Sequence, residues 1–322
     1  MRYLITGGAG FIGSNLAHTI LNNGDDVRIL DNFSTGRREN INDIMDKIEL
    51  IDGDIRDYWT VQEAVKNVDY ILHQAALPSV PRSVKNPLTS NAAIVDGTLN
   101  LLEASRKSNS IKRFVMASSS SVYGDTPTLP KREDMATDPL SPYAVGKLTC
   151  EYYCKVYYNL YGLETVCLRY FNIFGPRQDP GSEYAAVIPK FILSMMHGEK
   201  PLVFGDGNQS RDFTFIDNAV KANLLATTAE MAPGKYYNVA CGAQFTLNEL
   251  LDMLREIIGC NIQAEYSQPR PGDILHSYAD ISRARTEMDY NPKVDFRDGL
   301  KKTIKWFMKL ETSFTPTGGI KL

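Results

Sequence analysis

The first 170 residues alternate short β-rich runs with longer stretches of helical periodicity. Amphipathic helical patterns such as Phe11–Asn23 and Pro87–Ser108 lie between runs rich in aliphatic and aromatic residues. These runs, which predict strands, are residues 2–6, 25–31, 47–54, 68–76, 111–119 and 163–171. The alternation predicts right-handed βαβ crossovers, and we expect an α/β fold built on a parallel sheet over residues 1–172.

After about Asn172 the rhythm changes. Loops rich in Gly and Pro, such as "FGPRQDPGSE" and "FGDGNQSRD", separate helical patterns at Phe215–Met231 and Thr246–Ile258. We expect residues 173–322 to form a smaller, mixed C-terminal domain that binds the substrate. Residues 215–242 are expected to return to the first domain, because "KYYNVA" resembles one more strand of its sheet.

A glycine loop, "LITGGAGFIG", places Gly7, Gly10 and Gly13 between the first strand and the first helix. Backbone N–H groups of such a loop can approach a pyrophosphate, and the helix N-terminus adds positive potential. Asp31 ends the second strand, where a carboxylate accepts hydrogen bonds from an adenosine ribose and repels a 2'-phosphate. The pattern favours a Rossmann-like doubly wound sheet with NAD rather than NADP. A tight structural turn followed by a capping aspartate is the alternative.

Two later strand ends extend this predicted site. Asp54 ends the third strand and could meet the adenine. The segment "HQAA", residues 73–76, ends the fourth strand and would lie along the ribose and the pyrophosphate. For His73 itself, a packing role is the favoured interpretation.

A tyrosine and a lysine four residues apart follow in "LSPYAVGK". Ser141 suits a helix N-cap and Pro142 the first helical position, so Tyr143 and Lys147 lie on one helix face. A nearby ammonium can lower the pKa of a phenol, which is about 10 in isolation, and the phenol could then act as a general base. Pairs with this spacing also commonly only cover a helix surface.

A run of serines, "MASSSSVYG", follows the fifth strand. Its hydroxyls emerge at the carboxyl edge of the sheet, where ligands bind in such folds, and it precedes Tyr143 and Lys147 along the chain. The run could also be only a polar turn.

Composition narrows the classes of function. The chain of 322 residues is 43% hydrophobic and 23% charged with a net charge of −3, which predicts neither a nucleic-acid partner nor a polybasic membrane patch. We expect a cytoplasmic protein, because the N-terminus lacks a signal-peptide pattern and no apolar run could span a bilayer. The 5 cysteines lack zinc spacing and the 4 histidines are scattered, which predicts reduced thiols and no metal site.

Taken together, these motifs resemble the extended short-chain dehydrogenase/reductase family and, within it, the nucleotide-sugar 4-epimerases. The resemblance spans nearly the whole chain. It is carried by "TGGAGFIG", "DNFSTG", "GDIRD", "HQAA", "SSSSVYG", "SPYAVGK", "LRYFNIFGPRQ", "AAVIPKF", "GDGNQSRDF" and "PRPGD".

The resemblance implies catalytic roles for three residues. Tyr143 is the proton acceptor, Lys147 holds the nicotinamide ribose and lowers the pKa of the phenol, and Ser119 hydrogen-bonds the reacting sugar oxygen. The neighbouring Ser118, Ser120 and Ser121 are alternative positions for that hydroxyl.

It also implies two binding sets. The residues expected to bind NAD are Gly7, Gly10, Phe11, Ile12, Gly13, Asp31, Asn32, Ser34, Thr35, Gly36, Asp54, Ile55, Gln74, Ala75, Ala76, Asn91, Tyr143, Lys147 and Tyr170. The residues expected to bind the sugar nucleotide are Ser79, Ser119, Ser120, Asn172, Gln178, Ala186, Val187, Val203, Phe204, Gln209, Arg211, Arg270, Asp273 and Ser277. Within the second set, Val203 and Phe204 would flank the base, and Arg211 and Arg270 would bind phosphate.

The implied reaction is reversible epimerisation at C4 of a UDP-sugar through a 4-keto intermediate, with NAD staying bound. Relatives that remove water carry an Asp-Glu pair just after the catalytic hydroxyl, and decarboxylating relatives keep a glutamate there. Ser120 and Ser121 stand at those positions here. The remaining alternatives are a UDP-glucuronate 4-epimerase, a 4,6-dehydratase, a reductase that releases NADH, and a non-catalytic NAD-sensing module.

The resemblance also bears on the sugar and on assembly. Ser277, a small residue, favours UDP-N-acetylglucosamine and UDP-N-acetylgalactosamine over plain hexoses, and Gln178, Ala186 and Ser79 fit the same pattern. Pro78 departs from it, and UDP-glucose and UDP-galactose remain possible substrates. We expect a homodimer that pairs the helix carrying Tyr143 with the helix after Pro87.

Overall fold

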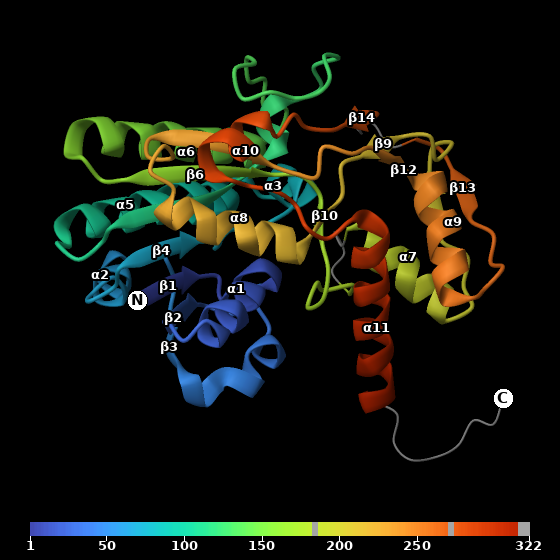
Figure 1. Ribbon diagram of the computed structural model, residues 1–322, viewed down its shortest axis with the longest axis horizontal. Helices are drawn as coiled ribbons and strands as arrows, with labels where there is room; N and C mark the ends of the chain where they lie inside the picture. Colours follow the sequence, from blue (N-terminus) through green and yellow to red (C-terminus); the bar gives the residue numbers. More distant parts are fainter. Residues whose placement is uncertain (182–185, 270–273, 315–322) are drawn as a thin grey trace.

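The computed structural model describes residues 1–181, 186–269 and 274–314. Within these residues, 7 parallel strands form one sheet in the order β3-β2-β1-β4-β5-β6-β11 (Figure 1). The strands are β1 (Arg2–Thr6), β2 (Asp26–Asp31), β3 (Ile48–Asp52), β4 (Tyr70–His73), β5 (Arg113–Ser119), β6 (Thr165–Tyr170) and β11 (Lys235–Val239).

The strands form where the sequence predicts them because their side chains are apolar on both faces. Leu4 and Ile5 are neighbours on β1, and each belongs to a different buried cluster on opposite sides of the sheet. The strand order reverses between β1 and β4, which opens a crevice at their carboxyl ends. The predicted doubly wound α/β sheet is confirmed.

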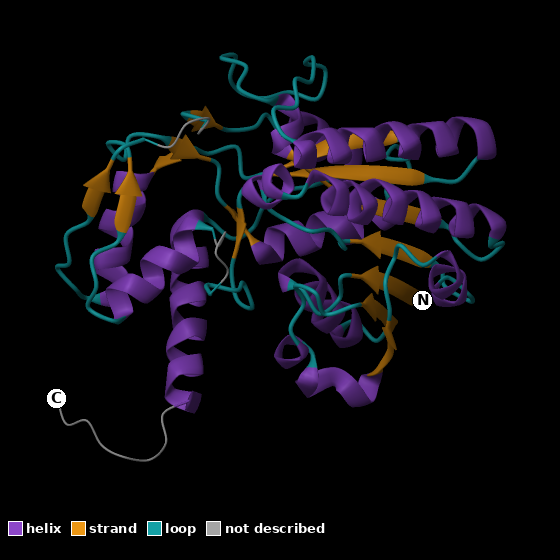
Figure 2. Cartoon of the chain, turned by 180° about the vertical axis from the view of Figure 1, so that it is seen from behind, coloured by secondary structure: helices purple, strands orange, loops and turns teal. Residues whose placement is uncertain are grey.

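Helices cover both faces of the sheet (Figure 2). One face carries α1 (Phe11–Asn22) and α8 (Ile216–Thr228), and the other carries α2 (Tyr58–Ala64), α5 (Gly97–Lys107) and α6 (Pro142–Tyr161). Each face therefore has its own apolar core, and the site at the carboxyl edge rests on both.

The predicted helix over Pro87–Ser108 is interrupted. It consists of α4 (Pro87–Asn91), a π-helical turn over Ala92–Asp96, and α5. The turn leaves the Ile94 carbonyl to accept hydrogen bonds from the Thr98 hydroxyl at 2.5 Å and the Cys150 thiol at 3.3 Å. Helical periodicity alone does not reveal such an inserted residue. The short α3 (Val80–Lys85) precedes this segment.

The second part of the chain is smaller and mixed (Figure 1). Helix α9 (Leu247–Ile258) begins with a capping box between Thr246 and Glu249. The other helices are α7 (Val187–Met196), α10 (Ser282–Met288) and α11 (Phe296–Phe314). The short strands are β7 (Ile173–Phe174), β8 (Leu202–Phe204), β9 (Ser210–Arg211), β10 (Thr214–Phe215), β12 (Phe245–Thr246), β13 (Glu265–Ser267) and β14 (His276–Ser277).

An aromatic cluster joins the two parts. The Phe213 and Phe296 rings stack with centroids 4.9 Å apart, and Phe174 meets Phe296 edge to face at 5.5 Å. These residues belong to the same buried cluster as Leu16 of α1 and Leu250 of α9. Because the core is continuous, the crevice at the sheet edge has a fixed wall on its C-terminal side.

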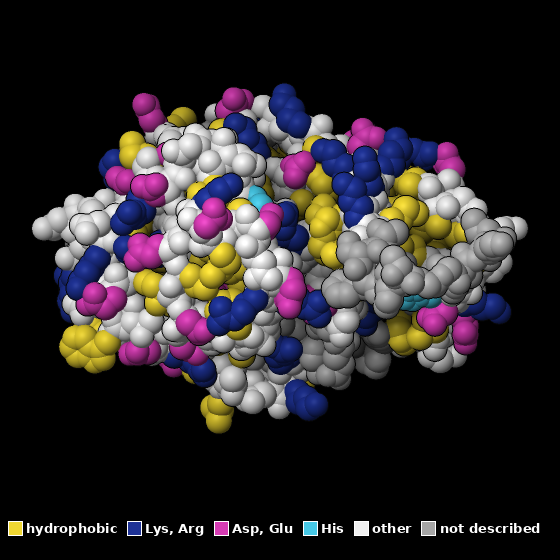
Figure 3. All heavy atoms as spheres, turned by 90° about the horizontal axis from the view of Figure 1, so that it is seen from below, with side chains coloured by type: hydrophobic (Ala, Val, Ile, Leu, Met, Phe, Trp, Pro, Cys, Tyr) yellow, Lys and Arg dark blue, Asp and Glu magenta, His cyan; other side chains and the backbone are white. Residues whose placement is uncertain are grey.

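The surface carries both signs of charge. Lys and Arg side chains are interspersed with Asp and Glu over most of the face seen in Figure 3, in keeping with the net charge of −3. Among the described helices, none has the length and apolar character needed to cross a bilayer.

Candidate active site

The loop between β1 and α1 accepts glycine alone at its tightest points. Gly7 has φ +69°, and a Cβ added there would lie 2.8 Å from the Ala75 backbone. A Cβ on Gly13 would lie 2.2 Å from the Gly7 carbonyl oxygen. The loop is therefore pressed between α1 and the end of β4, and its surface at the N-terminus of α1 is bare backbone. This cradle fits a dinucleotide pyrophosphate.

Asp31 braces this loop from the end of β2. Its carboxylate accepts hydrogen bonds from the Ala9 N–H at 2.9 Å and the Phe33 N–H at 2.8 Å. Burial raises the pKa of Asp31, and these two backbone donors oppose that shift. A Cβ on Gly36 would lie 2.8 Å from both carboxylate oxygens, so this position keeps the space beside the carboxylate open. Such space suits a ribose diol.

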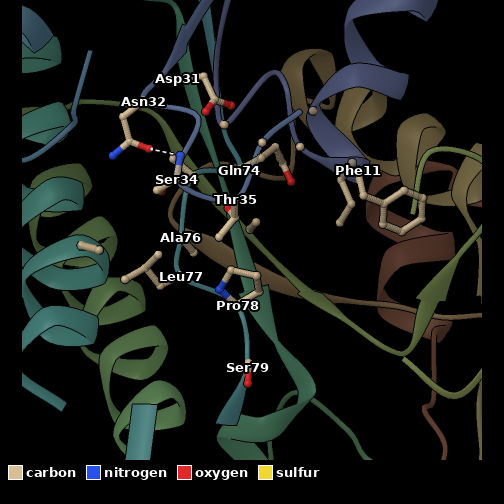
Figure 4. A pocket seen from close by; sticks show the side chains of 18 of the residues that line it. Phe11, Asp31, Asn32, Ser34, Thr35, Gln74, Ala76, Leu77, Pro78 and Ser79 are labelled. Atoms are coloured by element: carbon tan, nitrogen blue, oxygen red, sulfur yellow. Dashed lines mark hydrogen bonds between the residues drawn. The ribbon is translucent and has the colours of Figure 1, made fainter. Parts of the chain in front are cut away.

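Asn32 links the ends of β2 and β3. Its side-chain oxygen accepts from the Ser34 N–H at 3.0 Å, and its amide donates to Asp54 at 2.7 Å. Figure 4 shows Asp31, Asn32 and Ser34 together on one side of the pocket, while the segment from Ala76 to Ser79 runs away from them. The hydrogen bond from Arg56 lowers the pKa of Asp54 to about 2. A carboxylate that remains ionised thus faces the predicted adenine end.

These groups line one cavity of about 1010 Å³. Every residue that the sequence predicted for NAD lines it, apart from Asn91. Asn91 is exposed on α4, and the cavity wall there is formed by Ser90 and Ala93. The lining positions Thr89, Ser90 and Ala93 follow ordinary helical spacing, and Asn91 lies just outside that face.

A closed ring of three side chains holds the cavity floor. The Tyr170 hydroxyl donates to Gln74 at 3.1 Å, Gln74 donates to Asn223 at 3.0 Å, and Asn223 donates back to Tyr170 at 2.7 Å. Burial raises the pKa of Tyr170 to about 12, so its hydroxyl stays neutral at ordinary pH. Asn223, from α8, did not stand out in the sequence because a lone asparagine in a helix carries no motif.

Helix α6 begins as the sequence predicts. The Ser141 hydroxyl accepts from the Ala144 N–H at 3.2 Å, and Pro142 is the first helical residue. The Tyr143 N–H donates to the Ser83 hydroxyl at 3.1 Å, which fixes the start of α6 against α3. Lys147 donates to the Ala117 carbonyl at 2.7 Å, and its ammonium lies 5.9 Å from the Tyr143 ring centre. Both Tyr143 and Lys147 line the cavity.

The protonation tendencies of this pair differ from the sequence expectation. Burial raises the pKa of Tyr143, and a hydrogen bond with Ser119 offsets part of that rise. Burial also lowers the pKa of Lys147. Among the described residues, burial thus raises the pKa of the Tyr143 phenol by more than Lys147 was expected to lower it. Additional positive charge at the site would favour the phenolate.

The serine run separates into two roles. Ser118 lines the cavity, and its hydroxyl donates to the buried Glu151 of α6 at 2.5 Å. Ser119, at the end of β5, forms the hydrogen bond with Tyr143 and accepts from the Ser121 N–H at 3.2 Å. Ser120 and Ser121 start the 3₁₀ turn over Ser120–Tyr123. Of the serines in this run, Ser119 is therefore the one that meets the phenol.

The residues predicted for the sugar nucleotide divide into two groups. Ser79, Gln178 and Ala186 line the cavity. A second group lies in the smaller part, where Arg211 on β9 is the register partner of Ser277 on β14. Gln209 donates to the Phe204 carbonyl at 2.6 Å, and Val203 is buried in the core, where β8 pairs it with Tyr266 of β13.

The remaining predicted residues lie elsewhere. Asn172 donates to the Asp212 carbonyl at 3.3 Å, and Val187 is the first residue of α7. Arg270 and Asp273 lie outside the described residues.

The structure adds residues that the sequence analysis missed. Arg37, Arg177 and Asp179 line the cavity, and the Arg37 guanidinium pairs with the Asp179 carboxylate at 2.9 Å. Arg177 donates to Asn15 at 3.3 Å. The segment after β7 is thus tied to the loop after β2 and to α1. The sequence indicated these residues only by position, since Arg37 follows the predicted Gly36, and Arg177 and Asp179 flank the predicted Gln178.

Comparison with known proteins agrees with this geometry. Residues 3–240 match the NAD dependent epimerase/dehydratase family. The UDP-glucose 4-epimerase of Mycolicibacterium smegmatis is 38% identical over 310 residues, which cover 95% of this chain and 98% of that protein.

Two solved structures are also similar. One is the UDP-N-acetylglucosamine 4-epimerase of Methanobrevibacter ruminantium, in complex with UDP-N-acetylmuramic acid, with a TM-score of 0.92, 41% identity, and coverage of 96% of this chain and 98% of that chain. The other is the UDP-glucose 4-epimerase of Thermotoga maritima with UDP-glucose, with a TM-score of 0.92, 36% identity, and coverage of 97% and 100%. The cradle, the braced carboxylate and the Ser-Tyr-Lys arrangement are thus found in a chain that belongs to the NAD-dependent epimerase/dehydratase family.

Proposed function

We propose that the protein catalyses reversible epimerisation at C4 of a UDP-hexose or UDP-N-acetylhexosamine. The observation that carries the proposal is that Tyr143 and Lys147 line one cavity with the glycine cradle, while Ser119 is hydrogen-bonded to the Tyr143 phenol. Relatives that cover nearly the whole chain are UDP-sugar 4-epimerases, which supports this reaction over a non-catalytic NAD-binding role.

Residues of the chain would hold NAD at both ends. The Gly7–Gly13 loop would contact the pyrophosphate, Asp31 the adenosine ribose, and Lys147 the nicotinamide ribose. When bound, NAD takes a hydride from C4 of the sugar and returns it to the opposite face, and its oxidised ring brings a positive charge.

Tyr143 would accept and return the proton. Its phenolate would remove the proton from the sugar O4 as C4 is oxidised, and the phenol would return it after the 4-keto sugar has turned over. Ser119 would hydrogen-bond the same oxygen and orient it toward the phenol. Because Lys147 is buried and bonded to the Ala117 carbonyl, its ammonium keeps a fixed position beside the reacting oxygen.

Elimination of water would require a further acid and base. Ser120 and Ser121 occupy the positions where dehydrating relatives carry acids, and hydroxyls are too weakly acidic for a second proton transfer. This difference favours epimerisation, which needs a single proton acceptor and no net redox change.

The proposed sugar is N-acetylated. Ser277 is a small residue on β14, and its register partner Arg211 would lie beside the diphosphate. A small side chain at this position would leave room for an acetamido group. The 41% identical relative is a UDP-N-acetylglucosamine 4-epimerase, which supports the same choice. UDP-glucose carries a smaller hydroxyl in place of the acetamido group and fits the same space, so some turnover of UDP-glucose is expected.

Incubation of the purified protein with UDP-N-acetylglucosamine and UDP-glucose in separate samples tests the reaction and the preference. Anomeric proton NMR signals of the C4 epimer should appear in both, faster with the N-acetylated sugar. Steady NADH formation with either sugar would indicate a net oxidoreductase and contradict the proposal.

We also propose a homodimer. Val145, Tyr152, Val156 and Leu160 form an exposed apolar stripe along α6, and Leu88 of the adjacent α4 is 83% exposed. A second copy would bury this surface in a four-helix interface. Leu160→Glu should convert a dimer to a monomer in light scattering, and a wild-type monomer at micromolar concentration would refute the proposal.

The chain's organisation follows from the same roles. We propose that residues 1–172 together with 215–242 bind NAD and that the rest of 173–322 mainly binds the sugar nucleotide. The cysteines are free, which suits a reducing compartment, and we propose a cytoplasmic location.

A further inference from the structure

A buried triangle of polar side chains lies beneath the proposed proton acceptor. Glu151 lies one helical turn beyond Lys147 on α6. Its carboxylate accepts from the Ser118 hydroxyl at 2.5 Å and from two guanidinium nitrogens of Arg169, at 2.9 and 2.7 Å. Ser118 and Arg169 are register partners on β5 and β6. The three side chains therefore tie α6 to the two strands that it covers.

This ion pair is withdrawn from solvent. The side chains of Arg169 and Glu151 are 2% and 3% exposed. The guanidinium lies between two aromatic rings, 4.7 Å from the centre of Tyr123 and 4.0 Å from the centre of Tyr236. Burying two charges is expensive even when they pair, and an apolar trio of similar volume often gives equal or greater stability. Stability alone therefore does not account for charges at this place.

The triangle adjoins the groups that the proposed reaction uses. Lys147 donates to the Ala117 carbonyl, which belongs to the peptide unit joined to Ser118. Ser119, the next residue, meets the Tyr143 phenol. Fixing Ser118 through Glu151 thus fixes the acceptor of Lys147 on one side and the partner of Tyr143 on the other.

We infer that Glu151 and Arg169 are positioning residues for the proposed epimerase, holding the ammonium of Lys147 and the hydroxyl of Ser119 at the Tyr143 phenol while adding no net charge. The inference rests on the proposed function for its kinetic part. Both residues act through others, and neither lines the cavity.

The pair also sets the electrostatic balance below the site. Around Lys147 the titratable groups are Cys150, Cys154 and Glu151 from α6, Cys167 and Arg169 from β6, His73 from β4, and Tyr123 from the turn after β5. Burial holds His73 neutral by lowering its pKa to about 3, and burial raises the pKa of Cys150 to about 11. Besides Lys147, the charges in this set are those of Glu151 and Arg169, which oppose each other. Arg169 also interacts with Glu133, which in turn interacts with Arg283.

Opposite single substitutions test this balance. Glu151→Gln leaves a buried guanidinium uncompensated, which favours the phenolate, so the acidic limb of the kcat–pH profile should move to lower pH. Arg169→Met leaves the carboxylate, and the limb should move to higher pH. Glu151 lies eight residues beyond Tyr143 on α6, or about 12 Å along the helix axis. A unit charge at about 12 Å and an effective dielectric constant near 20 gives shifts on the order of one pH unit. The double variant should return close to the wild-type profile.

Two milder variants test the position of these groups without changing their charge, and they disturb the fold less. Ser118→Ala and Arg169→Lys keep the charges but loosen the triangle, and kcat should fall by about 10- to 100-fold with KM and the pH profile nearly unchanged. If these variants keep wild-type kcat, or if the folded single-charge variants lose thermal stability without any shift of the profile, the inference is overturned.

A readout without turnover separates this inference from the proposed function. Tyrosinate absorbance is titrated in each variant and in the same variant carrying Tyr143→Phe, and the difference reports the phenol of Tyr143 alone. Shifts in opposite directions for Glu151→Gln and Arg169→Met would support the inference even if no UDP-sugar is turned over. If the Tyr143 phenol titrates at the same pH in Glu151→Gln and Arg169→Met, the inference is overturned, even if the protein is an active epimerase.

Discussion

Gly13→Ala should abolish NAD retention because the cradle has no space for a methyl group. The added Cβ would lie 2.2 Å from the Gly7 carbonyl oxygen, 2.8 Å from the Gly8 Cα and 2.9 Å from the Gly7 carbonyl carbon. Since an ordinary contact is about 3.4 Å or more, the loop or the helix must move by about 1 Å. Gly7 has little room on its other side, where an added Cβ would meet the Ala75 backbone at 2.8 Å.

The magnitude follows from overpacking. Forcing a methyl group into a packed site costs about 1–3 kcal/mol, and here every close atom is backbone, so we expect the upper part of that range. A protein of 322 residues then loses roughly 3–5 °C in Tm. The displaced N–H groups should weaken NAD binding by at least about 10-fold.

Two matched variants make the assay specific. NAD retained after desalting and the affinity of the stripped protein are measured for each variant. Gly10→Ala meets a single atom, the Gly7 oxygen at 3.1 Å, and should lose much less affinity. Gly198→Ala has φ +77° and nothing within 4 Å, so it should cost stability while leaving NAD binding unchanged. Wild-type NAD affinity in Gly13→Ala would refute the assignment of the loop as the pyrophosphate cradle.

Two further predictions concern charged groups. Arg37→Ala breaks the ion pair with Asp179 at the cavity. It should speed NAD release by no more than about 5-fold, because both side chains are partly exposed, whereas Arg106→Ala on α5 should leave the release rate unchanged. Equal release rates for wild type and Arg37→Ala in stopped-flow exchange would contradict a role of this ion pair in retaining NAD. Burial raises the pKa of Asp212 to about 6, so its carboxyl contributes stability below about pH 4 and loses it as the pH rises through about 6. The unfolding free energy of wild type minus that of Asp212→Asn should fall by up to roughly 3 kcal/mol between pH 4 and pH 7 in urea titrations, and a constant difference would contradict this burial effect.

The sheet and the cofactor end were predictable because local sequence determines them. Strands buried on both faces read as continuous apolar runs, and the glycine loop and Asp31 depend on backbone space at fixed strand ends. The shared helix face of Tyr143 and Lys147 was equally predictable, since Ser141 and Pro142 define where α6 starts.

The support beneath the site depends on tertiary placement that no local pattern carries. Glu151 lies in a helix with many polar residues and would ordinarily be assigned to its exposed face. Its burial appears only when β6 brings Arg169 under α6. Asn91 is exposed on α4 beside the face that Ser90 and Ala93 present to the cavity, and a resemblance of motifs does not show which of these neighbouring positions faces inward.

The central claim is that the Tyr143 phenol transfers the proton at the sugar O4. The most direct test compares wild type and Tyr143→Phe, both checked for retained NAD, by following the anomeric NMR signals of UDP-N-acetylglucosamine. We predict that the wild type forms the C4 epimer and that Tyr143→Phe is slower by at least about 100-fold with its NAD content intact. Interconversion at the wild-type rate in Tyr143→Phe would contradict the account.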